Sequence, residues 1–275
     1  MPCGYCIGCR KQRQRDWMIR MVHESECHEQ NSFVTLTYDD ENLPEHQTLV
    51  LPHFQKFMKR LRRKYGARIR FFHAGEYGGE RGDPPGRPHY HAIIFGKDFS
   101  EDREIHDRGN TGHPIYRSLQ LEKLWPHGYS TIGDVNSTTC NYTAKYVWKK
   151  VVGDKGKIHY TRPDPETGEL IRIEPEYATM SRRPGLGFEW FQRYWTDVYP
   201  IDKVIIKGKE FAPPKYYDML LEHKDPDMYA HVLEKREVDS QAENRVANAT
   251  DQRLQDREKY HHALDTFFTR PKADL

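Results

Sequence analysis

The 275-residue chain has no run of about 18 apolar residues, which a membrane-spanning helix would need. It has no G-x-x-x-x-G-K-[ST] phosphate loop, no internal repeat and no low-complexity tract. The stretch after Met1 is rich in Pro, Cys and Gly and does not have the pattern of a signal peptide. We therefore expect a protein without a membrane segment, located in the cytosol.

Cysteine is scarce, and the five residues of this type are an odd number, which argues against a disulfide framework. Three of them, Cys3, Cys6 and Cys9, form C-x-x-C-x-x-C. This spacing is a candidate structural zinc site with a fourth ligand from Cys27, His23 or His28. An iron–sulfur cluster is a weaker alternative, and a turn with small buried thiols is the plain structural interpretation.

The composition is polar, with 36% hydrophobic and 31% charged residues and a mean hydropathy of −0.93. The formal net charge is only +2, but the charge is unevenly distributed. The segment from Glu210 to Leu275 is acidic, whereas His53 to Arg70 carries eight basic residues and no acidic one. Such a stripe fits a polyanionic partner, and Lys59, Arg60, Arg62 and Arg63 are candidate DNA contacts together with Arg87. A solvated helix face is the alternative.

The pattern of apolar residues predicts an α+β fold, with a β-α-β-β-α-β-α order over residues 30–152. We expect an antiparallel or mixed sheet with helices on one face, because the order lacks the regular alternation of a doubly wound fold. A helical extension follows from Pro213. The expected strands are Asn31–Tyr38, Arg68–Tyr77, His89–Phe95 and Gly128–Val135. The expected helices are Arg10–His28, Leu51–Tyr65 ended by Gly66, Tyr116–Trp125, Phe188–Tyr199, and one from Asn136 or Ser137 to about Val152. We expect residues 156–180 to form a hairpin around "PDPETGE".

Two histidines, His89 and His91, flank Tyr90 in "GRPHYHAIIFG". Residues i and i+2 of a strand share a face, so both imidazoles point the same way and suit two ligands of one metal ion. Glu76 ends the preceding predicted strand and is a candidate third ligand if the two strands pair. The alternatives are His73 or no third protein ligand. Two imidazoles and one carboxylate favour Mg²⁺ or Mn²⁺ with open coordination positions over a closed structural zinc site.

Two tyrosines, Tyr142 and Tyr146, lie four residues apart in "NYTAKYVWKK" and share one face of the predicted helix. A tyrosine hydroxyl is a competent nucleophile toward a phosphodiester when its charge is offset, and Lys145 lies at the same edge. A pair of packed aromatic residues is the alternative. Thr35 and Thr37 share a strand face and either line a groove for nucleic acid or are ordinary strand residues.

Together these blocks resemble the HUH endonuclease family of rolling-circle replication initiators, and within it the initiators of gokushovirus-type microviruses. The resemblance extends from residue 2 to residue 187. The strings that carry it are "PCGYCIGCRKQRQRDW", "FVTLTYDDENLP", "FMKRLRR", "FFHAGEYG", "GRPHYHAIIFG", "YTAKYVWKK" and "MSRRPGLG".

The resemblance implies an HUH/RRM-like core with a central antiparallel sheet and flanking helices. It implies that His89 and His91 hold Mg²⁺ or Mn²⁺, with Glu76 carried over by analogy. Tyr142 or Tyr146 then attacks single-stranded origin DNA, leaving a 5′-phosphotyrosyl bond and a free 3′-OH, with Lys145 beside them. It also implies a host polymerase, a host helicase, and action in the cytoplasm of a host bacterium. The order in which the two tyrosines act stays open.

We expect four segments, which are a Cys-rich start with a basic helix (1–29), the endonuclease core (30–152), a hairpin or linker (153–187) and a helical extension (188–275). A relaxase or a transposase of the same superfamily is the nearest alternative function. A non-catalytic single-stranded DNA-binding protein and a zinc-dependent regulator built on the cysteines are the alternatives from other classes.

Overall fold

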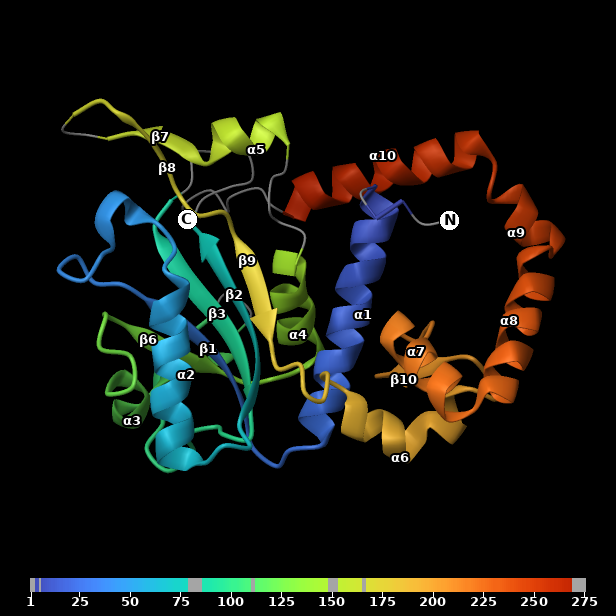
Figure 1. Ribbon diagram of the computed structural model, residues 1–275, viewed down its shortest axis with the longest axis horizontal. Coiled ribbons are helices and arrows are strands. Elements are labelled where there is room, and N and C mark those ends of the chain that lie inside the picture. The colour runs from blue at the N-terminus through green and yellow to red at the C-terminus, as the bar shows by residue number, and fades with distance from the viewer. Residues whose placement is uncertain are drawn as a thin grey trace.

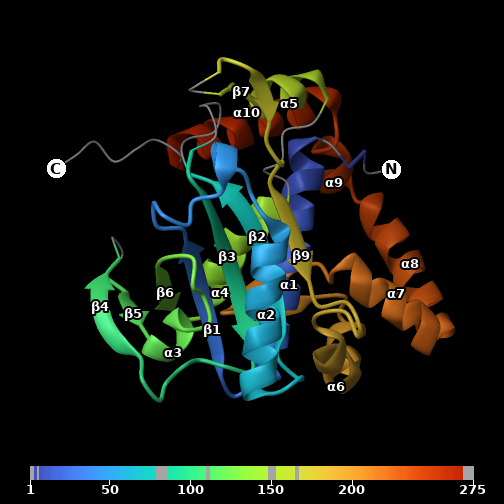
Figure 2. The same ribbon diagram turned by 60° about the vertical axis from the view of Figure 1, so that its left-hand side comes forward.

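The computed structural model describes residues 3–4, 6–78, 86–109, 112–147, 153–164 and 167–268, without the side chains of 155 and 265–268. Its centre is a seven-stranded sheet in the order β4-β5-β6-β1-β3-β2-β9 (Figures 1 and 2), in which every pair of neighbouring strands is antiparallel. The strands of this sheet are β1 (Asn31–Thr37), β2 (Arg70–Tyr77), β3 (Pro88–Phe95), β4 (Glu104–Arg108), β5 (Pro114–Arg117), β6 (Ser130–Gly133) and β9 (Tyr177–Met180). The predicted α+β class with an antiparallel sheet is confirmed.

Helix α2 (Leu51–Tyr65) covers one face of the sheet (Figure 2), with the bounds that the sequence predicts. Its apolar side chains recur at helical spacing and are buried against the sheet; they are Phe54, Phe57, Met58 and Leu61. Gly66 ends the helix at a φ of +111°, a backbone conformation that is strained for residues with a side chain and accessible to glycine. This apolar stripe fixes the basic side chains of α2 on its outer side.

The opposite face of the sheet is covered by α1 (Ile7–Glu26) and α4 (Ser137–Ala144), so the expectation of helices on one face only is wrong. The reason lies in β3, where every residue from Tyr90 to Phe95 is buried. A strand buried on both sides shows a continuous apolar run without alternation, and such a strand needs a helix on each face. Tyr90 and Ile94 belong to the α2 side, and Ile93 and Phe95 belong to the α1 side.

Helix α4 begins where predicted, because the Asn136 side chain accepts hydrogen bonds from the backbone N–H groups of Thr138 and Thr139. It ends earlier than predicted, at Ala144, and continues as the 3₁₀ turn η2 (Lys145–Val147). The rest of the predicted helix, residues 148–152, lies outside the described residues. Helix α1 packs closely against α4 and thereby positions it over the sheet.

The hairpin formed by β4 and β5 was not predicted. Every side chain of β4 is exposed, so the segment carries no apolar alternation that would mark a strand. β5 occupies the start of the predicted helix Tyr116–Trp125, and α3 is consequently only Leu119–Glu122. This hairpin extends the β6 edge of the sheet and lies away from the two histidines.

The remaining elements follow the sheet or extend from it. The predicted hairpin around "PDPETGE" is confirmed by the pairing of β7 and β8, but residues 177–180 join the central sheet as β9 instead. The helical extension is also confirmed, and no described helix has the length and apolarity to cross a membrane. The bounds are η1 (Glu45–Gln47), α5 (Asp154–His159), β7 (Thr161–Pro163), β8 (Leu170–Arg172), α6 (Phe188–Val198), β10 (Val204–Ile206), β11 (Lys209–Phe211), α7 (Lys215–Lys224), α8 (Pro226–Ser240), α9 (Glu243–Ala247) and α10 (Asp251–Phe268).

Candidate active site

Three side chains that can act as metal ligands meet on the α1 side of the sheet. Glu76 Oε1 lies 2.8 Å from His89 Nε2 and 3.0 Å from His91 Nε2. The strand register produces this convergence, because Glu76 pairs with His89 across β2 and β3, and His91 follows two residues later on the same face. Glu76 is therefore the carboxylate that joins the two histidines, as the sequence suggested.

His73, the alternative third ligand, faces the other way. Its Nδ1 lies 2.9 Å from the Thr179 hydroxyl, within hydrogen-bonding distance, and its ring stacks on Phe54 of α2. Residues three apart on a strand point to opposite faces, so a side chain at 73 cannot join the carboxylate at 76. His73 belongs to the buried core beneath α2.

The hydrogen bonds around His89 fit a bound cation. Its Nδ1 lies 3.1 Å from the carbonyl oxygen of Arg87, which can only accept, so Nδ1 carries the proton. In the neutral ring the lone pair of Nε2 then faces the Glu76 carboxylate, also an acceptor. Either a second proton or a cation between them resolves this conflict. Cis ligands of a metal bound at about 2.1 Å are about 3 Å apart, which matches the observed separations.

Thr35 of β1 holds the second histidine. Its hydroxyl lies 3.0 Å from His91 Nδ1, and the two residues are register partners across β1 and β3. A hydrogen bond to the far nitrogen fixes the ring orientation of a metal-ligating histidine. Thr37 lies on the same face, but its hydroxyl bonds to the Tyr129 carbonyl at 3.3 Å. The two threonines of "FVTLTY" therefore have different roles.

Tyr142 and Tyr146 both reach this cluster from α4 and η2. The Tyr142 hydroxyl lies 3.4 Å from His91 Nε2, and the Tyr146 ring stacks on the His91 ring with centroids 5.5 Å apart. The side chain of Tyr142 is 41% exposed, whereas that of Tyr146 is 3% exposed. Tyr142 is therefore the more accessible of the two tyrosines in this arrangement.

Burial and the nearby carboxylate keep both phenols protonated. Burial, and then the charge of Glu76, raises the pKa of Tyr142 to about 12. The same causes, with the addition of Tyr142 itself, raise the pKa of Tyr146 much further. Because Glu76 contributes to both shifts, a cation on this carboxylate acts in the direction of an ionised tyrosine. Lys145 is half-buried and is the first residue of η2, the turn that carries Tyr146.

The predicted basic DNA contacts divide into two groups. Lys59 and Arg63 are exposed on α2. Arg60 and Arg62 instead donate hydrogen bonds to the backbone carbonyls of Leu124 and Ile69 and hold neighbouring loops. Since α2 lies on the opposite face of the sheet from the histidines, its exposed cations are not beside the histidine and tyrosine cluster.

Arg87 lies close to the site. Its guanidinium donates to Asp40 Oδ1 at 2.7 Å and to the Tyr38 carbonyl at 3.0 Å, while its own carbonyl orients His89. The side chain is 43% exposed, so part of the guanidinium still faces solvent. Arg87 thus connects the end of β1 to the start of β3.

A basic pocket of about 900 Å³ lies at the far end of β2 and was missed as a site from the sequence. The signal was present in "MSRRPGLG", whose two arginines project beside the basic end of α2. Five arginines and one acidic residue line the pocket; they are Arg62, Arg68, Arg70, Arg182, Arg183 and Glu189. Arg70 forms an ion pair with Glu24, which leaves the exposed Arg68, Arg182 and Arg183 as its accessible cations.

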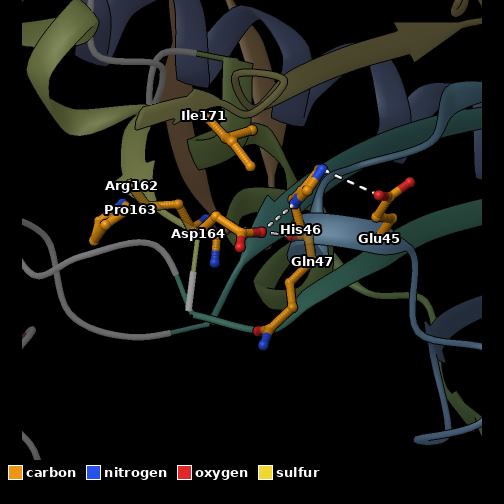
Figure 3. Close-up of a pocket in the computed structure, with 7 residues that line it drawn as sticks. All are labelled: Glu45, His46, Gln47, Arg162, Pro163, Asp164 and Ile171. Atoms are coloured by element: carbon orange, nitrogen blue, oxygen red, sulfur yellow. Dashed lines mark hydrogen bonds and ion pairs between the residues drawn. The ribbon is translucent and has the colours of Figure 1, made fainter. Parts of the chain in front are cut away.

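A smaller pocket of about 290 Å³ lies between η1 and the β7–β8 hairpin (Figure 3). His46 is one of its lining residues, and its Nδ1 lies 3.3 Å from Asp164 Oδ2 and its Nε2 3.4 Å from Glu45 Oε1. Arg162 donates to the Gln47 carbonyl at 3.1 Å. None of the residues predicted to act in catalysis lines this pocket, so it is separate from the histidine and tyrosine cluster.

The three N-terminal cysteines converge, with ligand atoms within 4.8 Å of one another. The three residues expected to supply a fourth ligand to these cysteines do not lie near them. Cys27 lies at the other end of α1, about 27 Å along the helix from Cys9. His23 is buried in the core, where its Nδ1 bonds to the Tyr217 hydroxyl and burial lowers its pKa to about 3. His28 is bonded to Glu24 at the same far end.

Comparison with known proteins connects this geometry to one family. Residues 31–151 match the family model described as replication-associated protein ORF2/G2P. The replication-associated protein ORF2 of Spiroplasma virus 4 is 32% identical over 252 residues, which are 86% of this chain and 73% of the relative. No solved structure matches the chain.

Two further relatives are of similar kind. The replication-associated protein ORF4 of Chlamydia phage 1 is 33% identical over 232 residues, 80% of this chain and 53% of the relative. The replication-associated protein VP4 of Bdellovibrio phage phiMH2K is 29% identical over 238 residues, 83% and 69% of the two chains.

Proposed function

Because the chain belongs to the phage replication-associated protein family with the ORF2 protein of Spiroplasma virus 4, we propose that it initiates rolling-circle replication by nicking and joining single-stranded origin DNA. One observation carries the proposal. The hydroxyl of the accessible Tyr142 lies 3.4 Å from His91, within a cluster whose three ligand atoms converge. A nucleophile beside a cation site is an arrangement that supports phosphodiester cleavage.

In the proposed reaction Glu76, His89 and His91 hold the metal and Tyr142 is the first nucleophile. These ligands would hold Mg²⁺ or Mn²⁺, and the ion would supply Lewis-acid stabilisation of the charge on the scissile phosphate. The Tyr142 oxygen forms a bond to phosphorus as the bond to the 3′ oxygen breaks. The products are a 5′-phosphotyrosyl link and a DNA 3′-OH, which carries the proton that the phenol has lost. One phosphoester bond replaces another, so rejoining requires no ATP.

The remaining residues assist this exchange. Thr35 and the Arg87 carbonyl orient the two imidazoles. Lys145 contributes positive charge near the phosphate. The buried Tyr146 is the nucleophile of the second cleavage, once the DNA has moved. A host polymerase extends the released 3′-OH, and a host helicase separates the strands in the bacterial cytoplasm.

We also propose that DNA contacts the cations outside the reacting cluster. The exposed arginines at the far end of β2 lie about 20 Å along the strand from Glu76, a distance that a few nucleotides span. Phosphates bound there give affinity without sequence reading.

An end-labelled cleavage assay tests the proposal. Single-stranded oligonucleotides tiled over the cognate phage genome are incubated with the protein and Mn²⁺. We expect 3′-labelled DNA to become covalently attached to protein and 5′-labelled DNA to be released with an end that a polymerase extends. His89→Ala with His91→Ala abolishes both products but retains salt-sensitive binding. Adduct that persists in these variants, or in EDTA, contradicts the metal site, and binding without any adduct indicates a non-catalytic DNA-binding protein.

A further inference from the structure

The C-x-x-C-x-x-C segment has no part in the proposed reaction, yet its three sulfurs converge. The Sγ atoms of Cys3 and Cys9 are 3.9 Å apart, and that of Cys6 lies within 4.8 Å of both. Sulfurs bound to one tetrahedral zinc ion at about 2.3 Å are about 3.8 Å apart. The cluster therefore already has the dimensions of three zinc ligands.

The local backbone suits thiolates. Cys6 is the N-cap of α1 and Cys9 lies in its first turn, so both sulfurs are at the positive end of the helix dipole. The backbone N–H of Cys6 donates to Cys3 Sγ at 3.3 Å, and Gly4 makes the preceding turn at a φ of +80°. Hydrogen-bond donors directed at sulfur favour its ionised, metal-binding form.

Helix α10 offers a candidate fourth ligand. Helix α10 crosses the N-terminal end of α1 in both views (Figures 1 and 2), and the two helices are in contact. Among the described side chains of α10, only those of His261 and Leu264 are half-buried, and the others are exposed. His261 and Leu264 are three residues apart and share one helix face, which is the face turned toward the protein.

We propose that Cys3, Cys6 and Cys9 bind a structural zinc ion, with His261 of α10 as the fourth ligand. The two ends of the described chain are then tied together by one metal, separate from the Glu76 cluster. Three thiolates and one imidazole form a closed tetrahedral site of the structural kind. The zinc compensates for the weak apolar packing of α10, whose described side chains are mostly exposed and bury little apolar surface.

Metal content and cobalt spectra test the site. The full-length protein is purified under reducing conditions, and zinc is measured in the wild type and in Cys9→Ser. We expect the substitution to remove about one zinc per chain, whereas Cys27→Ser, at the other end of α1, changes nothing. Equal zinc content in the wild type and in Cys9→Ser overturns the proposal. So does a protein that contains iron and inorganic sulfide, or one that keeps a Cys3–Cys9 disulfide although zinc and a reductant are present.

A cobalt titration of the wild-type chain stays informative if Cys9→Ser does not fold. Tetrahedral Co²⁺ with three thiolates gives intense visible bands and sulfur charge-transfer absorption. His261→Gln is expected to shift the visible bands and to weaken metal binding. The loss of affinity should exceed the roughly 10–100-fold that follows when a residue hydrogen-bonded to a metal ligand is replaced. The neighbouring His262→Gln is the matched control and is expected to leave the spectrum unchanged. An unaltered spectrum in His261→Gln overturns the fourth ligand.

Limited proteolysis gives a readout that does not depend on DNA cleavage. Zinc removal is expected to expose α10 to protease while the sheet core stays intact, and zinc addition is expected to restore protection. Loss of DNA cleavage with intact zinc binding would contradict the proposed function alone, because the two metal sites share no residue.

Discussion

A single carboxylate oxygen of Glu76 meets both imidazoles, and the rest of the site depends on how these rings are held. The Arg87 carbonyl fixes the proton of His89, and the Thr35 hydroxyl faces the far nitrogen of His91. The two-residue spacing of the histidines predicts their shared face. It does not predict Thr35, because this contact depends on the pairing of β1 with β3.

Thr35→Val is expected to weaken Mn²⁺ binding by about tenfold or more, because it removes the hydrogen-bond partner of His91 with little change in volume. The measurement is a calorimetric Mn²⁺ titration of the folded variant. Thr37→Val is the matched control on the same strand face, and its hydroxyl bonds to the Tyr129 carbonyl instead of a histidine. Equal affinity in Thr35→Val and the wild type would show that the hydroxyl has no orienting role.

At the scale of elements, the sequence predicts those strands and helices that have one buried face. Helix α2 shows this well, since its apolar stripe and Gly66 set both ends. The charged strand β4 lacks such a stripe and was missed. The helices α1 and α4 on the second face of the sheet were not predicted either. The reason is that β3 is buried on both sides, so its sequence shows no alternation between apolar and polar residues.

The two basic surfaces belong to different elements and can be compared directly. Arg182→Gln with Arg183→Gln is expected to lower the affinity for single-stranded DNA and to reduce the dependence of log Kd on log salt by about 0.7 per lost contact. Lys59→Gln with Arg63→Gln removes the same charge from the exposed side of α2. A larger loss from the α2 pair, measured by fluorescence anisotropy at several salt concentrations, would place the DNA on that helix.

Across the whole molecule, segments distant in sequence complete each site. The tyrosines of α4 and η2 reach the histidines of β3 because α1 holds α4 against the sheet. Only the order and type of the motifs could be predicted for this arrangement, through their resemblance to replication initiators. The expectation of a fourth ligand at Cys27, His23 or His28 is wrong, because α1 is a 20-residue helix that separates these residues from the three N-terminal cysteines.

The division into four segments stays a prediction. Helices of the acidic C-terminal extension share a core with α1 and the sheet, since Tyr217 and Leu221 of α7 pack with Phe72 and Phe95 in one cluster. This packing gives the extension a structural role that its charge pattern did not suggest.

The identity of the residue that becomes linked to DNA tests the central claim most directly. The adduct formed with Mn²⁺ is digested with nuclease and protease, and the modified peptide is sequenced by mass spectrometry. We predict a nucleotide on Tyr142 after the first cleavage, an adduct that Tyr142→Phe loses and Tyr146→Phe retains, because Tyr142 is the exposed one of the pair. A nucleotide on any residue other than these tyrosines, or an undiminished adduct when both are replaced by Phe, would contradict the account.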